Sequence, residues 1–251
     1  MLGAALYPFN FCPPNGVQWL SHEPGLYLNG SGIAHTRGSD LIAGTKSISI
    51  HLLLKERSNS KNWGPKEIFS LYDGCPSPSI LVGQWGGRIF LYSRFEKEDE
   101  HYWYKTFLTK HRFPREEVHF VTVTFGVDEK AIYMDSSLLE KRDVEIKDSA
   151  NVQFSGRLLL GNSHTGKAGW WGEIKGLAIY NRILPHEEIV KHHETVVQKG
   201  MSGLADISGC LALYPLDEGK GNVAKSTLSE SRPLYIPESR KAFASILMDL
   251  P

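Results

Sequence analysis

The chain has 251 residues and carries 28 Lys and Arg against 28 Asp and Glu, so its formal net charge is zero when the histidines are neutral. This balance argues against a general binder of nucleic acid or of anionic membranes, which needs a basic excess. Charged residues at 22% and hydrophobic residues at 41% are typical of a folded chain, and the length suits one large domain or two small ones.

Alternating hydrophobic residues predict strands along most of the first 180 residues. In Ser47–Lys55 every second residue is Ile or Leu, the period-2 pattern of a half-buried strand. The stretch VHFVTVTF, which ends at Phe125, alternates in the same way. Further strands are predicted at Gly25–Asn29, Glu67–Tyr72, Ile80–Trp85, Arg88–Phe95, Tyr102–Leu108, Ala131–Met134, Leu138–Asp143, Arg157–Gly161 and Glu173–Tyr180.

Turn residues separate these strands. Gly86 and Gly87 predict a two-residue hairpin between Ile80–Trp85 and Arg88–Phe95, because the primed turns that suit hairpins need positive φ. Strands that recur at short intervals, with no helices between them, indicate an antiparallel sandwich or barrel.

One helix is predicted, at Pro185–Lys199. Pro185 suits the first helical position, Glu187 and Glu188 favour the N-terminal end of the helix dipole, and Gly200 is placed to end the helix. The stretch Glu230–Pro251 has no clear pattern and is interpreted as a tail or linker.

Two motifs resemble functional sites but lack required residues. Gly161–Ala168 matches the GxxxxGK of a phosphate loop, yet Ala168 stands where Ser or Thr must hold magnesium, so the segment is interpreted as a hairpin loop. His186 begins an HExxH-like stretch, but Val190 replaces the second histidine, which favours a solvated helix. No three-residue metal site follows from either.

The cysteines, the apolar runs and the acidic run indicate no disulfide framework, membrane span or glucanase site. Cys12, Cys75 and Cys210 are odd in number and have no CxxC spacing, which argues against a disulfide framework or a cysteine-based zinc site. No run of about 18 apolar residues exists that would span a bilayer. The acidic run Glu96–Glu100 lacks the E-x-D-x-x-E spacing of laminarinase-type glucanases and is interpreted as a charged loop or hairpin tip.

Aromatic residues suggest a binding surface. Tyr92, Phe95, Tyr102, Trp103 and Tyr104 flank the acidic run, where they could stack on sugar rings or pack in the core, and strand alternation lets at most half of them share one face. The candidate carbohydrate-binding residues are Trp85 and Trp103 for stacking, with Arg94 and Glu96 as polar partners.

Several segments resemble the LamG-like, concanavalin A-like jelly rolls. The stretch WWGEIKGLAIYNRILPHEEI from Trp170 resembles their closing strand and short helix, Leu213–Asn222 (LYPLDEGKGN) the opening "DEG-x-G" strand, and Tyr27–Gly32 the strand that follows it. The resemblance implies an all-β, two-sheet antiparallel jelly roll with one short helix. Because the "DEG-x-G" segment comes last in this chain, we expect it to close the same sandwich.

Tyr7–Leu28 and LYPLDEGKGN are together similar to the extracytoplasmic region of VanZ-like bacterial membrane proteins. That resemblance implies an extracytoplasmic domain, tethered through membrane segments on either side of this chain. It supplies no catalytic residue.

The sequence thus predicts one jelly-roll domain at 7–236, followed by a tail or linker at 237–251. The leading hypothesis is a non-catalytic recognition module that binds an envelope glycan, with no nucleic-acid partner. The alternatives are a protein-interaction or structural module without a sugar site, and a glycoside hydrolase of the same fold. No cofactor is predicted; calcium is compatible with the fold, but no motif places it.

Overall fold

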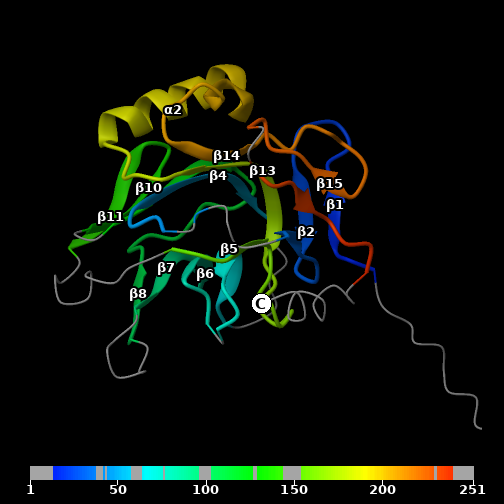
Figure 1. Cartoon of the computed structure of the whole chain (residues 1–251), viewed down its shortest axis with the longest axis horizontal. Helices are drawn as coiled ribbons and strands as arrows, with labels where there is room; N and C mark the ends of the chain where they lie inside the picture. Colours follow the sequence, from blue (N-terminus) through cyan, green and yellow to red (C-terminus); the bar gives the residue numbers. More distant parts are fainter. Residues whose placement is uncertain are drawn as a thin grey trace, which may run out of the picture.

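In the computed structural model, two antiparallel sheets pack face to face, and one long helix lies on the outside of one sheet (Figure 1). This confirms the all-β sandwich with a single helix that the sequence predicts. The structure describes residues 14–37, 42, 44–57, 64–75, 77–95, 103–126, 129–143, 154–228 and 231–239.

Each sheet has eight strands. The first sheet runs in the order β1 (Val17–Trp19), β2 (Leu26–Asn29), β13 (Trp171–Tyr180), β4 (Ile48–Glu56), β9 (Val118–Phe125), β10 (Glu129–Met134) and β11 (Ser137–Asp143), with β14 (Cys210–Tyr214) also beside β13. The second sheet runs in the order β15 (Val223–Ala224), β16 (Leu234–Tyr235), β3 (Ala34–Thr36), β12 (Arg157–Leu160), β5 (Lys66–Tyr72), β6 (Ile80–Trp85), β7 (Arg88–Phe95) and β8 (Trp103–Leu108).

Strand alternation builds the core between the sheets. The β4 side chains Ile48, Ile50, Leu52 and Leu54 are fully buried and pack with inward residues of the second sheet such as Ile80, Val82 and Leu91. Removing this apolar surface from water is the main term that holds the two sheets together.

Helix α2 (His186–Lys199) and the short 3-10 helix η2 (Met201–Leu204) cover the outer face of the first sheet (Figure 1). Ile189 and Val196 of α2 pack with Phe120 and Tyr180 of the sheet in a second hydrophobic cluster. The first sheet is therefore covered on both faces, whereas on the outer face of the second sheet Trp85 and Thr106 are exposed.

Most predicted elements are present, with ends shifted by one or two residues. The hairpin at Gly86 and Gly87 has φ of 58° and 76°, as its sequence requires, and α2 follows Pro185. β14 pairs with β13, so the late segment joins the sandwich as expected. The short strands β1, β3, β15 and β16 were not predicted. Because β16 pairs with β3 and Ser239 bridges to Pro14, the interpretation of the stretch from Glu230 as a tail or linker was wrong for residues 231–239.

The segment that resembles a phosphate loop is a loop, but not a hairpin. It leads from β12 in the second sheet to β13 in the first, so the prediction of a hairpin was wrong in this respect. Cys75 and Cys210 are free thiols, and Cys12 lies outside the described residues. None of the described helices has the length and apolar character needed to cross a membrane.

Candidate functional site

The outer face of β5 to β8 carries a hollow of about 770 Å³, here called the sheet groove. Its volume lies within the range of about 300–1,000 Å³ that is usual for ligand sites. The strand residues that line it are Lys66, Glu67, Leu81, Trp85, Phe90, Tyr92 and Thr106, and residues Ser163–Ala168 form a wall.

The floor of the sheet groove follows from strand register. Leu81 pairs with Tyr92, and Tyr92 pairs with Thr106, so these side chains form one outward row across three strands. The Phe90 ring lies over Gly83, where a Cβ atom would come within 2.6 Å of it. The glycine at position 83 therefore lets the aromatic ring lie flat in the floor.

The wall is a loop that its own side chains hold in shape. Asn162 Oδ1 accepts hydrogen bonds from the amides of Ser163 (2.9 Å) and Ala168 (3.1 Å). The amide of Glu67 donates to the carbonyl of Ala168 at 2.8 Å, which fastens the loop to β5. The exposed side chains Thr165 and Lys167 then stand at the edge of the groove.

Glu67 is the one carboxyl group among the described residues that line the sheet groove. Burial raises its pKa to about 7, against a smaller opposing effect of a hydrogen bond with Ser70. At neutral pH a large fraction of Glu67 is therefore protonated, and this form can donate a hydrogen bond to a ligand.

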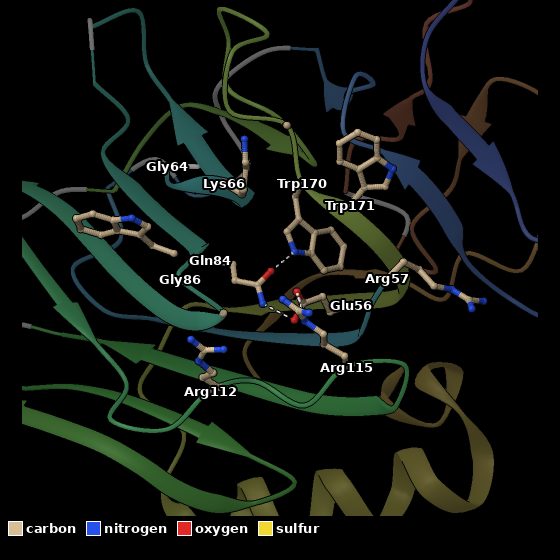
Figure 2. Close-up of a pocket in the computed structure, with 13 residues that line it drawn as sticks. Glu56, Arg57, Gly64, Lys66, Gln84, Gly86, Arg112, Arg115, Trp170 and Trp171 are labelled. Atoms are coloured by element: carbon tan, nitrogen blue, oxygen red, sulfur yellow. Dashed lines mark hydrogen bonds and ion pairs between the residues drawn. The ribbon is translucent and has the colours of Figure 1, made fainter. Parts of the chain in front are cut away.

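A second hollow of about 300 Å³, here called the cationic pocket, lies at one end of the sandwich (Figure 2). Residues from both sheets and from four of the segments that connect strands line it. They are Glu56, Arg57, Gly64, Lys66, Gln84, Trp85, Gly86, Gly87, Arg112, Arg115, Gly169, Trp170 and Trp171.

Buried polar side chains form a chain across the base of this pocket (Figure 2). Trp170 Nε1 donates to Gln84 Oε1 at 2.9 Å, and Gln84 Nε2 donates to Glu56 Oε2 at 2.7 Å. Since Glu56 and Gln84 belong to different sheets, these bonds tie the sheets together. Burial raises the pKa of Glu56, while its bonds to Gln84 and Arg115 oppose this effect.

The four cations of the pocket differ in how far they are neutralised. Arg57 donates from Nε to Glu173 Oε1 at 2.7 Å and from Nη1 to Glu116 at 2.9 Å. Arg115 lies 3.3 Å from a carboxylate oxygen of Glu56.

Lys66 and Arg112 have no ion-pair partner among the described residues. Within the same residues, no group of three His, Cys, Asp or Glu side chains could hold a metal ion.

Trp85 connects the two hollows, because it lines both of them. Its side chain is 54% exposed, although most large apolar side chains of the second sheet are buried. Lys66 and Gly64 also line both hollows, so the sheet groove and the cationic pocket form one continuous concave surface.

Of the four residues that the sequence singled out, Trp85 and Arg94 do not come together. Trp85 pairs with Arg88 at one end of the β6–β7 hairpin, whereas Arg94 lies six residues further along β7, or about 20 Å away. Trp103 pairs with Phe95, beyond Arg94 on the same side. Glu96 lies outside the described residues. Trp85 and Arg94 therefore do not share one site, because they lie at opposite ends of the β6–β7 hairpin.

Arg94 binds residues of the segment between β5 and β6. It forms an ion pair with Asp73, and its Nη1 donates to the carbonyl of Ser77 at 2.6 Å. The structure thus gives Arg94 a role in holding the segment between β5 and β6.

Sequence reasoning missed the partners that surround Trp85. Lys66, Arg112 and Trp170 come from β5, a loop after β8 and the start of β13, and no local pattern connects them. One signal was present: Gln84 occupies an inward position after Ile80 and Val82, and a buried amide needs hydrogen-bond partners.

Solved structures share this fold at low sequence identity. A candidate carbohydrate-binding protein from Bacteroides ovatus is 10% identical, with a TM-score of 0.60, and the match covers 86% of this chain and 60% of that protein. The ligand-binding domain of botulinum neurotoxin serotype D, solved with N-acetylneuraminic acid, is 15% identical with a TM-score of 0.53 over 71% of this chain and 44% of its own. A sialidase from Trypanosoma rangeli is 12% identical with a TM-score of 0.55 over 71% of this chain and 28% of its own.

The chain thus spans 60% or less of each of these three proteins, and at such identities the likeness concerns the fold. No curated protein matches the sequence. A family model, Laminin_G_3, matches residues 29–190, which is more than half of the chain and includes β4 to β13. The chain therefore belongs to the Laminin_G_3 family of the concanavalin A-like lectin/glucanases superfamily.

Proposed function

We propose that the domain is a non-catalytic carbohydrate-binding module whose ligand lies in the sheet groove with one sugar ring stacked on Trp85. The exposure of Trp85 between two hollows carries this proposal. The flat apolar face of an exposed indole ring suits the C–H face of a sugar ring, and the two hollows beside Trp85 give a ligand room to reach it.

The polar groups around Trp85 suit the hydroxyls of the same ligand. Thr106, Thr165 and Lys167 are exposed at the edge of the sheet groove, and Tyr92 is half-buried in its floor. Ligand sites typically combine apolar walls with a few polar groups that fix orientation, as this groove does.

A non-catalytic role is supported by the distribution of carboxyl groups. Glycoside hydrolysis typically uses two carboxyl groups about 5–9.5 Å apart, one on each side of the scissile bond. Among the described residues, two carboxyl groups line the continuous surface, Glu67 in the sheet groove and Glu56 in the cationic pocket. Glu56 is already bonded to Gln84 and paired with Arg115.

The structural neighbours support the same class of ligand. One is a candidate carbohydrate-binding protein, and another was solved with N-acetylneuraminic acid. We carry over the ligand class as a proposal, and none of the neighbours' binding residues.

Trp85→Ala is expected to lower affinity for the best ligand of a glycan array at least about tenfold, since it removes the stacking surface. Titration calorimetry with that glycan measures the loss. The melting temperature should stay within about 2 °C, because substitution at an exposed site rarely changes stability by more than about 0.5 kcal/mol. Trp85→Phe should retain most of the affinity, because it keeps an aromatic face.

Leu138→Ala is the matched control, because Leu138 is 51% exposed but belongs to β11 in the other sheet. It should bind like the wild type. If no glycan on the array binds while an envelope protein is captured specifically, the module recognises protein. If the glycan is cleaved during the titration, the domain is an enzyme.

We also propose that the module faces the outside of a bacterial membrane, to which the full protein tethers it. The similarity of Tyr7–Leu28 and Leu213–Asn222 to VanZ-like proteins supports this placement. Protease treatment of intact spheroplasts tests it: the domain should be digested without lysis, and protection until lysis would contradict an external location.

A further inference from the structure

We infer that the cationic pocket receives the carboxylate of an acidic sugar unit, so that the ligand of this module is a carboxylated saccharide. The inference deepens the proposed carbohydrate binding and rests on it. Four cationic side chains and one carboxylate line the pocket, and that carboxylate is already bound by Gln84 and Arg115.

Lys66 and Arg112 supply positive charge that no carboxylate of the described residues neutralises. Neither has an ion-pair partner in the described part of the chain, whereas Arg57 and Arg115 both have one. In the view of Figure 2, Lys66 and Arg112 lie on either side of the Gln84–Trp170 pair. An anion that contacts either cation would gain a charge-assisted hydrogen bond, which is stronger than a neutral one.

Backbone hydrogen bonds fix the main-chain positions of Lys66 and Arg112. Lys66 begins β5 and pairs with Gln84 of β6. The loop that carries Arg112 is fastened to the Gly86–Gly87 turn, since the amide of Phe113 donates to the carbonyl of Gly87 at 2.7 Å. The aliphatic part of Arg112 packs on the same turn, with Cδ at 3.6 Å from the position of a Cβ on Gly87. The cation is thus partly pre-positioned, which lowers the entropy cost of binding.

The pocket is also in the right place for a neighbouring sugar unit. Lys66, Gly64 and Trp85 line both hollows, so a ring stacked on Trp85 would have its next unit over the cationic pocket. Gly86 leaves open space, since a Cβ built on it meets no atom within 4 Å. A guanidinium group can bind a carboxylate through two parallel hydrogen bonds, which favours this anion in a site built around arginine.

The test compares oligosaccharides that contain galacturonic, glucuronic or N-acetylneuraminic acid with the carboxyl methyl ester of each, by titration calorimetry on the whole chain. The best acid should bind at least about tenfold more tightly than its ester, because esterification removes the negative charge that the cations would bind. In the Lys66→Gln/Arg112→Gln double variant, acid and ester should bind equally, at the affinity that the ester has for the wild type.

Lys110→Gln is the control, because Lys110 is exposed near Arg112 but does not line the pocket. It should keep the tenfold preference. Equal binding of acid and ester to the wild type would overturn the inference and leave carbohydrate binding intact, provided that Trp85→Ala weakens both. Tighter binding of sulfated than of carboxylated oligosaccharides would overturn the carboxylate assignment. Failure of every acid and every ester to bind, while a neutral glycan of the array binds and Trp85→Ala weakens it, would overturn the inference alone, whereas failure of every glycan of the array would remove the proposed function itself.

Discussion

Between pH 6.5 and pH 5, the protein should lose stability because two histidines are buried in neutral form where helix α2 packs on the first sheet. His51 of β4 is fully buried; its Nδ1 is 2.8 Å from the hydroxyl of Thr122, and its Nε2 is 2.9 Å from Nδ1 of His192. Burial lowers the pKa of His51 well below its usual value, and the neighbouring His192 adds to this effect. Burial also lowers the pKa of His192, which Glu188 opposes and Arg182 reinforces.

Stability falls with falling pH because the unfolded chain binds more protons than the folded protein. In the unfolded chain both histidines take up a proton near pH 6.5, whereas in the folded protein they take it up only at lower pH. The unfolded state therefore binds more protons below pH 6.5, and stability falls as the pH falls. Each histidine that stays neutral down to pH 5 should cost about 2 kcal/mol over this range, from about 1.4 kcal/mol per pH unit.

Urea denaturation at pH 7.5 and at pH 5 measures this effect against a His51→Gln/His192→Gln variant. Glutamine retains hydrogen-bonding groups but does not titrate, so the stability of the wild type relative to the variant should fall by about 2–4 kcal/mol between the two values. Glu67 acts in the opposite direction, because its raised pKa of about 7 stabilises the folded state as the pH falls. The comparison cancels its contribution, which both proteins share. Parallel pH profiles for the two proteins would contradict the prediction.

The pattern of the sequence predicted most of the fold because the two sheets are regular. Alternation in Ser47–Lys55 places one set of side chains in the core, and its opposite face meets α2. The strands that were missed, β1, β3, β15 and β16, have only two or three residues each, and so few residues show no readable period.

The candidate site was harder to predict, because residues distant in sequence assemble it. Trp85 was a candidate because of its residue type, whereas Arg112 and Lys66 reach it through the packing of a loop on the Gly86–Gly87 turn and through the pairing of β5 with β6. Local reasoning instead grouped Trp85 with Arg94, which strand direction moves to the other end of the hairpin. Side-chain alternation predicts which face a residue takes, whereas it does not predict which end of a sheet another segment approaches.

Arg94→Met is expected to destabilise the fold by about 3 kcal/mol. The guanidinium is 5% exposed and forms an ion pair with Asp73, whose side chain is 17% exposed. Methionine fills much of the same volume but leaves the Asp73 carboxylate and the Ser77 carbonyl without this donor. Removing one partner of a buried ion pair typically costs about 3–5 kcal/mol, and the partial exposure of Asp73 favours the lower end.

Urea denaturation of three variants separates this structural role from ligand binding. Arg94→Met/Asp73→Asn should recover part of the lost stability, because no uncompensated charge remains, and the difference measures the coupling between the two side chains.

Arg94→Met should keep glycan affinity within about twofold under conditions where it is folded, since Arg94 lies about 20 Å from Trp85 along the hairpin. Arg94→Lys should fall between the wild type and Arg94→Met, because lysine keeps the charge and loses the planar fork. A tenfold loss of affinity at unchanged stability would instead make Arg94 a ligand contact and extend the binding surface toward β8.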